Sequence, residues 1–274
     1  MKNSLSNQHA MPLHKALRAL LGLTWTEAWR GQLFFLLLLL VLVVESLAWF
    51  MASMAITESS EIRLAICAWL YRCGLVFIVL VHVIGNLVRE VESGFLHVLL
   101  AHSLSRTQYV IGRFVGFALI ALGAALAISG LLALHTPATG LSGLLLWSAS
   151  FMLEMLLVTA IAVFFALGFA RLLPALLAAC TFYVVARLLD VIRAMAQSPI
   201  GQDPNSMSVA GSRWVLDGLA WFTPPLGAYT RTDWLLLPDS LATAPSALTL
   251  LSWAIAASCL LVTAAIVDFH GHEL

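Results

Sequence analysis

The stretch FFLLLLLVLVVESLAWF, residues 34–50, decides the class of this protein. It contains one ionisable side chain, Glu45, and apart from Ser46 its other residues are apolar. A helix needs about 20 mainly apolar residues to cross the hydrocarbon core of a bilayer. With its flanking residues the stretch reaches that length, so we predict a transmembrane helix over Gln32–Ala55.

The composition of the whole chain agrees with a membrane protein. Of 274 residues, 61% are hydrophobic and 10% are charged, whereas about 25% of the residues in a soluble domain are charged. The formal net charge is zero, which gives no indication of a nucleic-acid partner. We therefore expect contact with membrane lipid and no nucleic-acid binding.

Further apolar segments reach the length of a span, and they predict an all-α integral membrane protein with six transmembrane helices. They are Ala65–Val88, Tyr109–Leu134, Leu144–Ala170, Leu173–Ala196 and Ser246–Val267. A signal peptide cleaved near Ser53-Met54-Ala55 is the alternative for the first segment. Its apolar run is longer than the roughly 7–15 residues of a signal-peptide core, so we interpret it as a retained span.

Basic residues near the ends of the spans predict the orientation, because they are enriched in cytoplasmic loops. One side carries Lys2, Lys15, Arg18, Arg30, Arg89, Arg106, Arg113 and Arg171, and the other carries Arg63, Arg193, Arg213 and Arg231. The first side is expected to be cytoplasmic. We therefore place both termini, residues 1–31 and the tail 268–274, in the cytoplasm, and residues 32–267 form the membrane domain with an external segment over 197–245.

The sequence before the first span, MPLHKALRALLGLTWTEAWRG (residues 11–31), predicts an amphipathic helix in the cytoplasmic membrane interface. Its apolar residues recur at helical spacing: Leu13, Leu17, Leu20, Leu21, Trp25 and Trp29. The alternative is a first span that begins early. Glu27 and Arg30 disfavour it, because charged side chains are costly inside a bilayer.

Residues 89–106, REVESGFLHVLLAHSLSR, predict a short helix held between the second and third spans. Gly94 permits a sharp turn after the charged residues, and Phe95 and Leu99 would share a face at the i, i+4 spacing, as would Leu96 and Leu100. Ser103 or Ser105 could cap the next helix. A helix lying flat on lipid is the alternative to a docking surface.

The segment VREVESGFLHVLLAHSLSRTQYVIGRFVG, residues 88–116, resembles the corresponding segment of ABC-2 type transporter permeases. The matching positions are Arg89, Glu90, Glu92, Gly94, Leu99, Leu100, Ser105, Arg106, Tyr109, Gly112, Arg113 and Gly116. Ala101-His102-Ser103 stands where many members carry Ser-x-Pro. Weaker similarity covers residues 23–40, 172–192, 221–236 and 267–274, and within the family the chain is most similar to permeases of nitrous oxide reductase maturation.

This resemblance implies an export mechanism driven by a partner. Residues 89–106 would be a coupling helix that docks on a separate ABC ATPase subunit, with a second permease copy, identical or different, completing the pathway. The implied docking residues are Glu90, Glu92, Gly94, Phe95, Leu96, Leu99, Leu100, Ser105 and Arg106. No G-x-x-x-x-G-K-[ST] motif occurs, so ATP and Mg²⁺ would bind in the partner. We expect no cofactor and no enzymatic activity in this chain.

Several charged residues fall inside the predicted spans, where a charge facing lipid costs at least about 2.5–3.5 kcal/mol. Among them are Glu45, Arg72, Glu154, Arg187 and Asp190. Counting residues from the span ends places the first four at similar depth in the outer half. We predict that Glu45 pairs with Arg72 and Glu154 with Arg187, either holding the bundle together or lining a pathway.

Other functions remain as alternatives. Cys67, Cys73, Cys180 and Cys259 have no metal-site spacing, so we predict no metal site, although several Met and Cys residues in the outer halves would suit Cu(I). His82 is interpreted as a packing residue rather than a proton relay. The chain contains no HExxH or G-x-S-x-G motif, which disfavours an integral-membrane enzyme. A scaffold protein that docks an ATPase without transport is a second alternative. A secondary transporter would often show an inverted repeat, which this sequence does not show. The substrate stays open.

Overall fold

The computed structural model describes residues 13–54, 59–94, 105–136, 140–169, 171–197, 214, 216, 218, 223–229, 231–236 and 245–271. Within these ranges, six helices are long and apolar enough to cross a membrane. They are α2 (Leu33–Met54), α3 (Ser59–Glu92), α5 (Arg106–Ala133), α6 (Leu141–Phe169), α7 (Leu172–Gln197) and α10 (Ala247–Gly271). Each contains most of one predicted span, so the predicted multi-pass all-α fold is confirmed.

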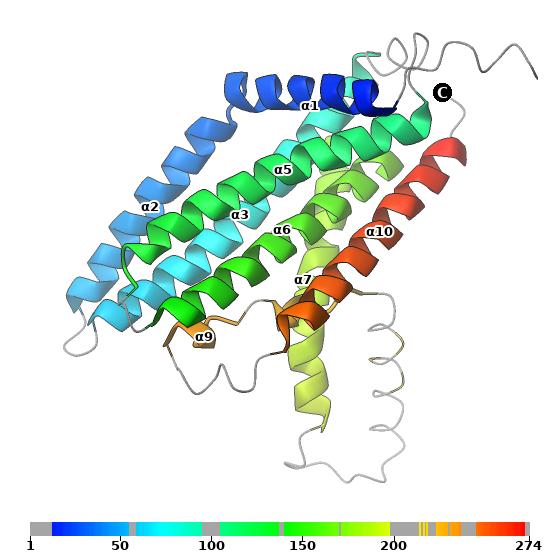
Figure 1. Ribbon diagram of the computed structural model, residues 1–274. Helices are drawn as coiled ribbons and strands as arrows, with labels where there is room; N and C mark the ends of the chain where they lie inside the picture. Colours follow the sequence, from blue (N-terminus) through cyan, green and yellow to red (C-terminus); the bar gives the residue numbers. More distant parts are fainter. Residues whose placement is uncertain are drawn as a thin grey trace, which may run out of the picture.

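The long helices run up and down through one bundle (Figure 1). At one end lie the start of α2, the end of α3, the start of α5 and the end of α10, with α1 (Leu13–Arg30) across them; we call it the α1 end. The opposite end carries the 3₁₀ turn η2 (Leu226–Ala228) and the short helix α9 (Asp233–Leu236), and we call it the α9 end.

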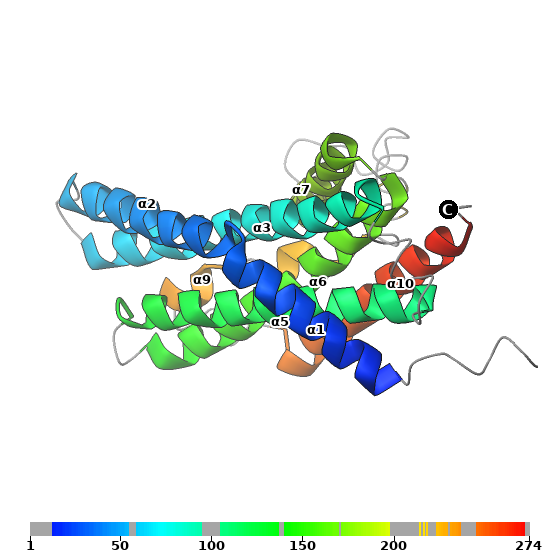
Figure 2. The ribbon, with the colours of Figure 1, turned by 90° about the horizontal axis from the view of Figure 1, so that it is seen from above.

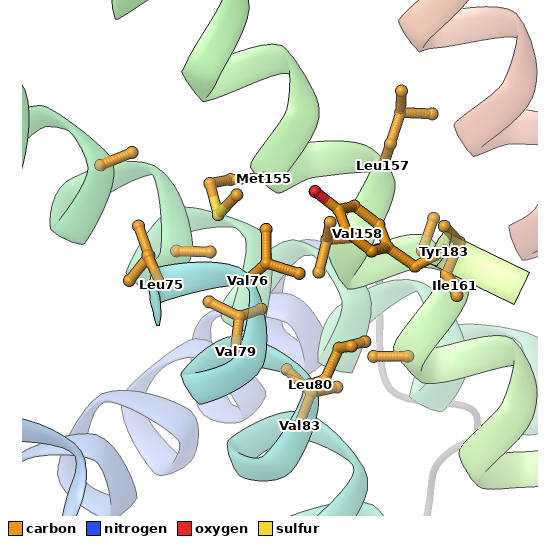
Figure 3. Close-up of a cluster of buried hydrophobic side chains, with 14 of the residues drawn as sticks. Leu75, Val76, Val79, Leu80, Val83, Met155, Leu157, Val158, Ile161 and Tyr183 are labelled. Atoms are coloured by element: carbon orange, nitrogen blue, oxygen red, sulfur yellow. The ribbon is translucent and has the colours of Figure 1, made fainter. Parts of the chain in front are cut away.

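Helix α6 forms the centre of the bundle. In its most apolar window 67% of the residues are buried, against 17% in α2, and it packs against α3, α5, α7 and α10. Figure 3 shows the middle of this core, where Leu75, Val76 and Val79 of α3 face Met155 and Val158 of α6. The core is therefore formed mainly by α6 and α3, and not by α2, which is the most hydrophobic span.

The outer surfaces of the spans are apolar as well. Phe34, Phe35, Trp69 and Leu126 are all more than half exposed, and helix α2 carries exposed apolar side chains on most of its length. A soluble protein would keep such a surface small. This arrangement is the one expected when the surrounding solvent is lipid.

Helix α1 packs across α5, as the view from above shows (Figure 2). Its buried face is made by Leu20, Thr24 and Ala28, whereas Trp25 is 58% exposed and Trp29 is 62% exposed. The predicted helix is present, and Leu20 of its predicted apolar face is buried while Trp25 and Trp29 of that face are exposed. Gly112 and Gly116 of α5 lie against Leu20 and Thr24, and these small residues let the two helices approach closely.

A glycine on α5 permits this close approach. A Cβ atom at Gly116 would lie 2.8 Å from Thr24 Oγ1, nearer than side-chain atoms normally come. We expect Gly116→Val to lower the free energy of unfolding by about 1–3 kcal/mol through overpacking, measured by denaturant titration in detergent. Gly123→Val is the matched control, since a Cβ atom there would meet nothing within 4 Å. Equal losses in the two variants would contradict the packing account.

Candidate functional site

The two ends of the predicted coupling segment are described, and both have the expected local structure. Gly94 has a φ of +71°, a left-handed conformation that favours glycine. Ser105 caps α5: its hydroxyl accepts a hydrogen bond from the backbone N–H of Gln108, whose side chain in turn accepts one from the backbone N–H of Ser105. Residues 95–104, including Phe95, Leu96, Leu99 and Leu100, lie outside the described residues.

A buried arginine joins three helices next to this segment. The Arg113 guanidinium of α5 is fully buried and donates to both carboxylate oxygens of Glu27 in α1, at 2.9 and 3.1 Å. It also pairs with Glu90 of α3, through Nε at 3.1 Å and a second contact through Nη2. We call Thr24, Glu27, Glu90, Tyr109 and Arg113 the Arg113 cluster.

The other two members complete the hydrogen bonding of this cluster. The Tyr109 hydroxyl donates to Glu90 Oε2 at 2.6 Å, and Arg113 donates to Thr24 Oγ1 at 2.8 Å. Arg113 therefore pairs with two carboxylates, and hydrogen bonds from Tyr109 and to Thr24 support the buried charges. The end of α3, the start of α5 and α1 are joined to one another within about two helical turns of the coupling segment.

This geometry changes the interpretation of two predicted docking residues. Glu90 is only 7% exposed and faces inward, so it anchors the segment instead of offering its carboxylate at the surface. Arg106 donates to the backbone carbonyl of Phe269 at 2.9 Å and lies over its ring, satisfying a carbonyl at the end of α10. Glu92 is exposed, and its docking role stays a prediction.

At the α9 end, Arg72 of α3 is the centre of a second cluster. Its guanidinium lies 3.2 Å from Glu154 Oε2 of α6, donates to the backbone carbonyl of Tyr229, and donates to Ser150 Oγ at 3.2 Å. It also lies 4.7 Å from the centre of the Trp147 ring. Both charged side chains are fully buried, so the pair meets the requirement for a charge inside the membrane.

The predicted pairing of the intramembrane charges is therefore wrong. Arg72 pairs with Glu154 and not with Glu45. Arg187 reaches Glu154 only through Tyr183, whose hydroxyl accepts from Arg187 at 2.8 Å and donates to Glu154 at 2.6 Å. A depth counted along each span cannot tell which helices are neighbours. We call Arg72, Glu154, Tyr183 and Arg187 the Arg72 cluster.

Asp190 lies in α7, but its side chain is outside the described part of the chain. Its predicted place beside Arg187 stays a prediction.

Glu45 belongs to a third group of polar side chains, which lies nearer the α9 end of the bundle. Its carboxylate accepts from Arg63 at 3.0 Å, from Tyr71 at 2.8 Å and pairs with His135 Nε2 at 3.0 Å. These partners come from α3 and from the turn after α5. The network joins α2 to α3 and to the turn after α5. The Glu45 side chain is about a quarter exposed.

Tyr229 attaches the connection between α7 and α10 to the bundle. Its backbone carbonyl accepts from Arg72, and its hydroxyl donates to the backbone carbonyl of Leu250 in α10 at 2.7 Å. Burial raises the pKa of the Tyr229 hydroxyl to about 12, so it stays protonated and remains a hydrogen-bond donor at neutral pH.

The remaining predicted residue, His82, has packing contacts. Its ring lies edge-on to Phe117 at 5.9 Å and within 3.2 Å of the Asn86 side chain, as expected for a packing histidine.

Sequence reasoning missed several residues of these clusters. Tyr71, Tyr183 and His135 carry no charge that marks them in an apolar run. Arg113 was counted as a cytoplasmic charge and as a position that matches the permeases, but not among the intramembrane charges, although it lies inside the predicted third span. That position was the available signal, because an arginine within a span needs a buried partner.

The described clusters are ion pairs and hydrogen-bond networks that join helices. Comparison with known protein-family models and with curated proteins finds no match for this chain.

Proposed function

We propose that this chain is the membrane-spanning subunit of an ATP-binding cassette transporter of the ABC-2 type. It moves a substrate outward across a bacterial inner membrane, and a separate ATPase subunit that holds ATP and Mg²⁺ drives it. The membrane fold agrees with this proposal, and the resemblance of residues 88–116 to such permeases specifies the partner.

The observation that carries the proposal is the Arg113 cluster. A coupling segment can move transmembrane helices only if both of its ends are firmly attached to them. Glu90 lies at the start of the segment and Arg113 follows its end, and Arg113 pairs with both Glu90 and Glu27 of α1. Movement of the segment would therefore be transmitted to α3, α5 and α1 together.

The proposed orientation places the α1 end in the cytoplasm. Basic residues gather there, namely Arg18, Arg30, Arg89, Arg106 and Arg171 in the described part. Helix α1 would then lie in the cytoplasmic interface, with exposed Trp25 and Trp29 at the level of the lipid headgroups, where tryptophan is enriched. A second permease copy would complete the pathway.

Co-purification tests this proposal. We expect an ATP-binding subunit to accompany the tagged chain when it is purified from its native membrane in mild detergent. Leu99→Asp should lower the amount of bound ATPase at least about tenfold, because burying an unpaired carboxylate in an apolar contact costs more than the roughly 1–3 kcal/mol of a neutral polar group. Quantitative mass spectrometry of the purified complex measures the ratio.

Leu134→Asp is the matched control, because Leu134 is a 79% exposed leucine at the opposite end of α5. It should retain the partner. A wild-type chain that arrives without any ATPase would refute the transporter proposal, and equal retention in both variants would refute the docking role of residues 95–104.

A further inference from the structure

We propose that Glu45, Cys67 and His135 form a binding site for a divalent transition-metal ion of the Zn²⁺ class at the α9 end. One carboxylate oxygen, the Cys67 Sγ and one His135 ring nitrogen all lie within 4.8 Å of one another. The three residues come from α2, α3 and the turn after α5. This site goes beyond the transporter proposal and does not depend on it.

The donor set selects the class of ion. Zn²⁺ binds thiolate sulfur, imidazole nitrogen and carboxylate oxygen, at about 2.0–2.3 Å, whereas Ca²⁺ and Mg²⁺ require oxygen ligands. Tetrahedral ligands at those bond lengths are about 3.3–3.8 Å apart, so the described arrangement needs to close by about 1 Å. The three side chains come from separate segments and can make such a movement by rotamer adjustment.

The thiol is the member of the trio that lies outside the hydrogen-bond network and inside the hydrophobic core. Cys67 is fully buried beneath the polar group, and among the described residues its Sγ has no hydrogen-bond partner. Glu45 and His135 already contact each other at 3.0 Å. A metal ion between them would bring Cys67 into the same network and would replace that hydrogen bond with two metal–ligand bonds.

The neighbouring groups are compatible with a bound ion. Tyr71 donates to Glu45 Oε1 and Arg63 to Oε2, which are the outer hydrogen bonds that orient a ligating carboxylate. On binding, Cys67 gives its proton to solvent, so the ion, thiolate and carboxylate sum to zero charge. The positive charge of Arg63 therefore still faces a carboxylate and not a bare cation.

An entry path leads to the trio. A cavity of about 400 Å³ opens at this end of the bundle and is lined by Ser53, Ser59, Ser60, Arg63, His135 and Trp49. His135 therefore belongs to both the cavity and the ligand trio. Water in the cavity would supply the fourth ligand, which gives the open coordination position seen in zinc sites with three protein ligands.

Titration of the purified, metal-stripped full-length chain with Co²⁺ alone tests the site. We expect one ion per chain and a thiolate-to-cobalt charge-transfer band that added Zn²⁺ removes. Cys67→Ser should abolish the band, and His135→Gln should weaken Co²⁺ binding by at least about tenfold. Tyr71→Phe should weaken it by about 10–100-fold, as expected for loss of an orienting hydrogen bond.

Cys180→Ser is the matched control. Cys180 is also a free cysteine in a span, but it is only partly buried and lies outside the trio. It should keep the band unchanged. A wild-type chain without a thiolate band, or a band that persists in Cys67→Ser, would overturn the proposal. Size-exclusion profiles confirm folding, and the His135→Gln titration decides the outcome if Cys67→Ser does not fold.

Discussion

Arg72→Met is expected to reduce the free energy of unfolding by about 3–5 kcal/mol, because it leaves the Glu154 carboxylate buried without its cation. Both side chains are almost completely excluded from solvent. The variant also removes the donor to the backbone carbonyl of Tyr229. The connection between α7 and α10 therefore loses its attachment to the centre of the bundle. Unfolding by SDS titration in mixed micelles, followed by circular dichroism, measures the change.

A second substitution identifies the partner. Arg72→Met combined with Glu154→Gln should recover most of the loss, since no uncompensated charge is then buried and Tyr183 can still donate to the amide oxygen. Arg72→Met combined with Glu45→Gln should not recover the lost stability. Recovery with Glu45→Gln instead would restore the pairing that depth alone predicted. Arg171→Met, at an exposed arginine, should change the stability by less than about 0.5 kcal/mol.

Arg113→Met is expected to release α1 from the bundle. The substitution leaves Glu27 and Glu90 as two carboxylates without the guanidinium that separates them, a loss of about 3–5 kcal/mol for a buried network. Contact between α1 and α5 can be measured directly. A Cβ atom at Gly112 would lie 3.3 Å from the Leu20 Cβ, close to the distance of a disulfide.

The measurement uses Leu20→Cys with Gly112→Cys in a chain whose four native cysteines are replaced by serine. We expect the disulfide to form readily with Arg113 present and at least about tenfold more slowly in Arg113→Met, because the two helices then spend less time in contact. Arg89→Met changes an exposed arginine near the same end and should leave the rate unchanged. Equal rates in all three chains would show that Arg113 does not hold α1.

Arg113→Met also tests whether the Arg113 cluster transmits movement or contributes only to folding. If the Arg113 cluster transmits movement, Arg113→Met should lower substrate-stimulated ATPase activity of the complex more than it lowers the amount of bound ATPase. A parallel fall of both would mean that the cluster contributes only to folding.

The sequence alone determined the number and the approximate positions of the long apolar helices, because the thickness of a bilayer sets a length that an apolar helix must reach. It also determined local features that depend on a few neighbouring residues. The turn at Gly94 follows from its permitted left-handed conformation, and the start of α5 follows from the Ser105 cap with Gln108.

The tertiary structure decided which charges meet. Residue counting predicts a similar depth for Glu45, Arg72, Glu154 and Arg187, so every pairing between opposite charges among them was consistent with the sequence. Helix α6 lies beside α3 and presents Glu154 to Arg72, while α2 presents Glu45 to Arg63 and Tyr71. Neighbour relations in a bundle depend on side-chain packing between segments far apart in the chain, and hydropathy does not contain that information.

The same reason explains the faces of α1 and the candidate metal trio. The spacing of leucines and tryptophans gave an apolar face for α1, but the contact with α5 is made where Leu20 and Thr24 meet Gly112 and Gly116. Glu45, Cys67 and His135 have no motif spacing, because each lies on a different segment. Only the folded bundle brings their ligand atoms within reach of one ion.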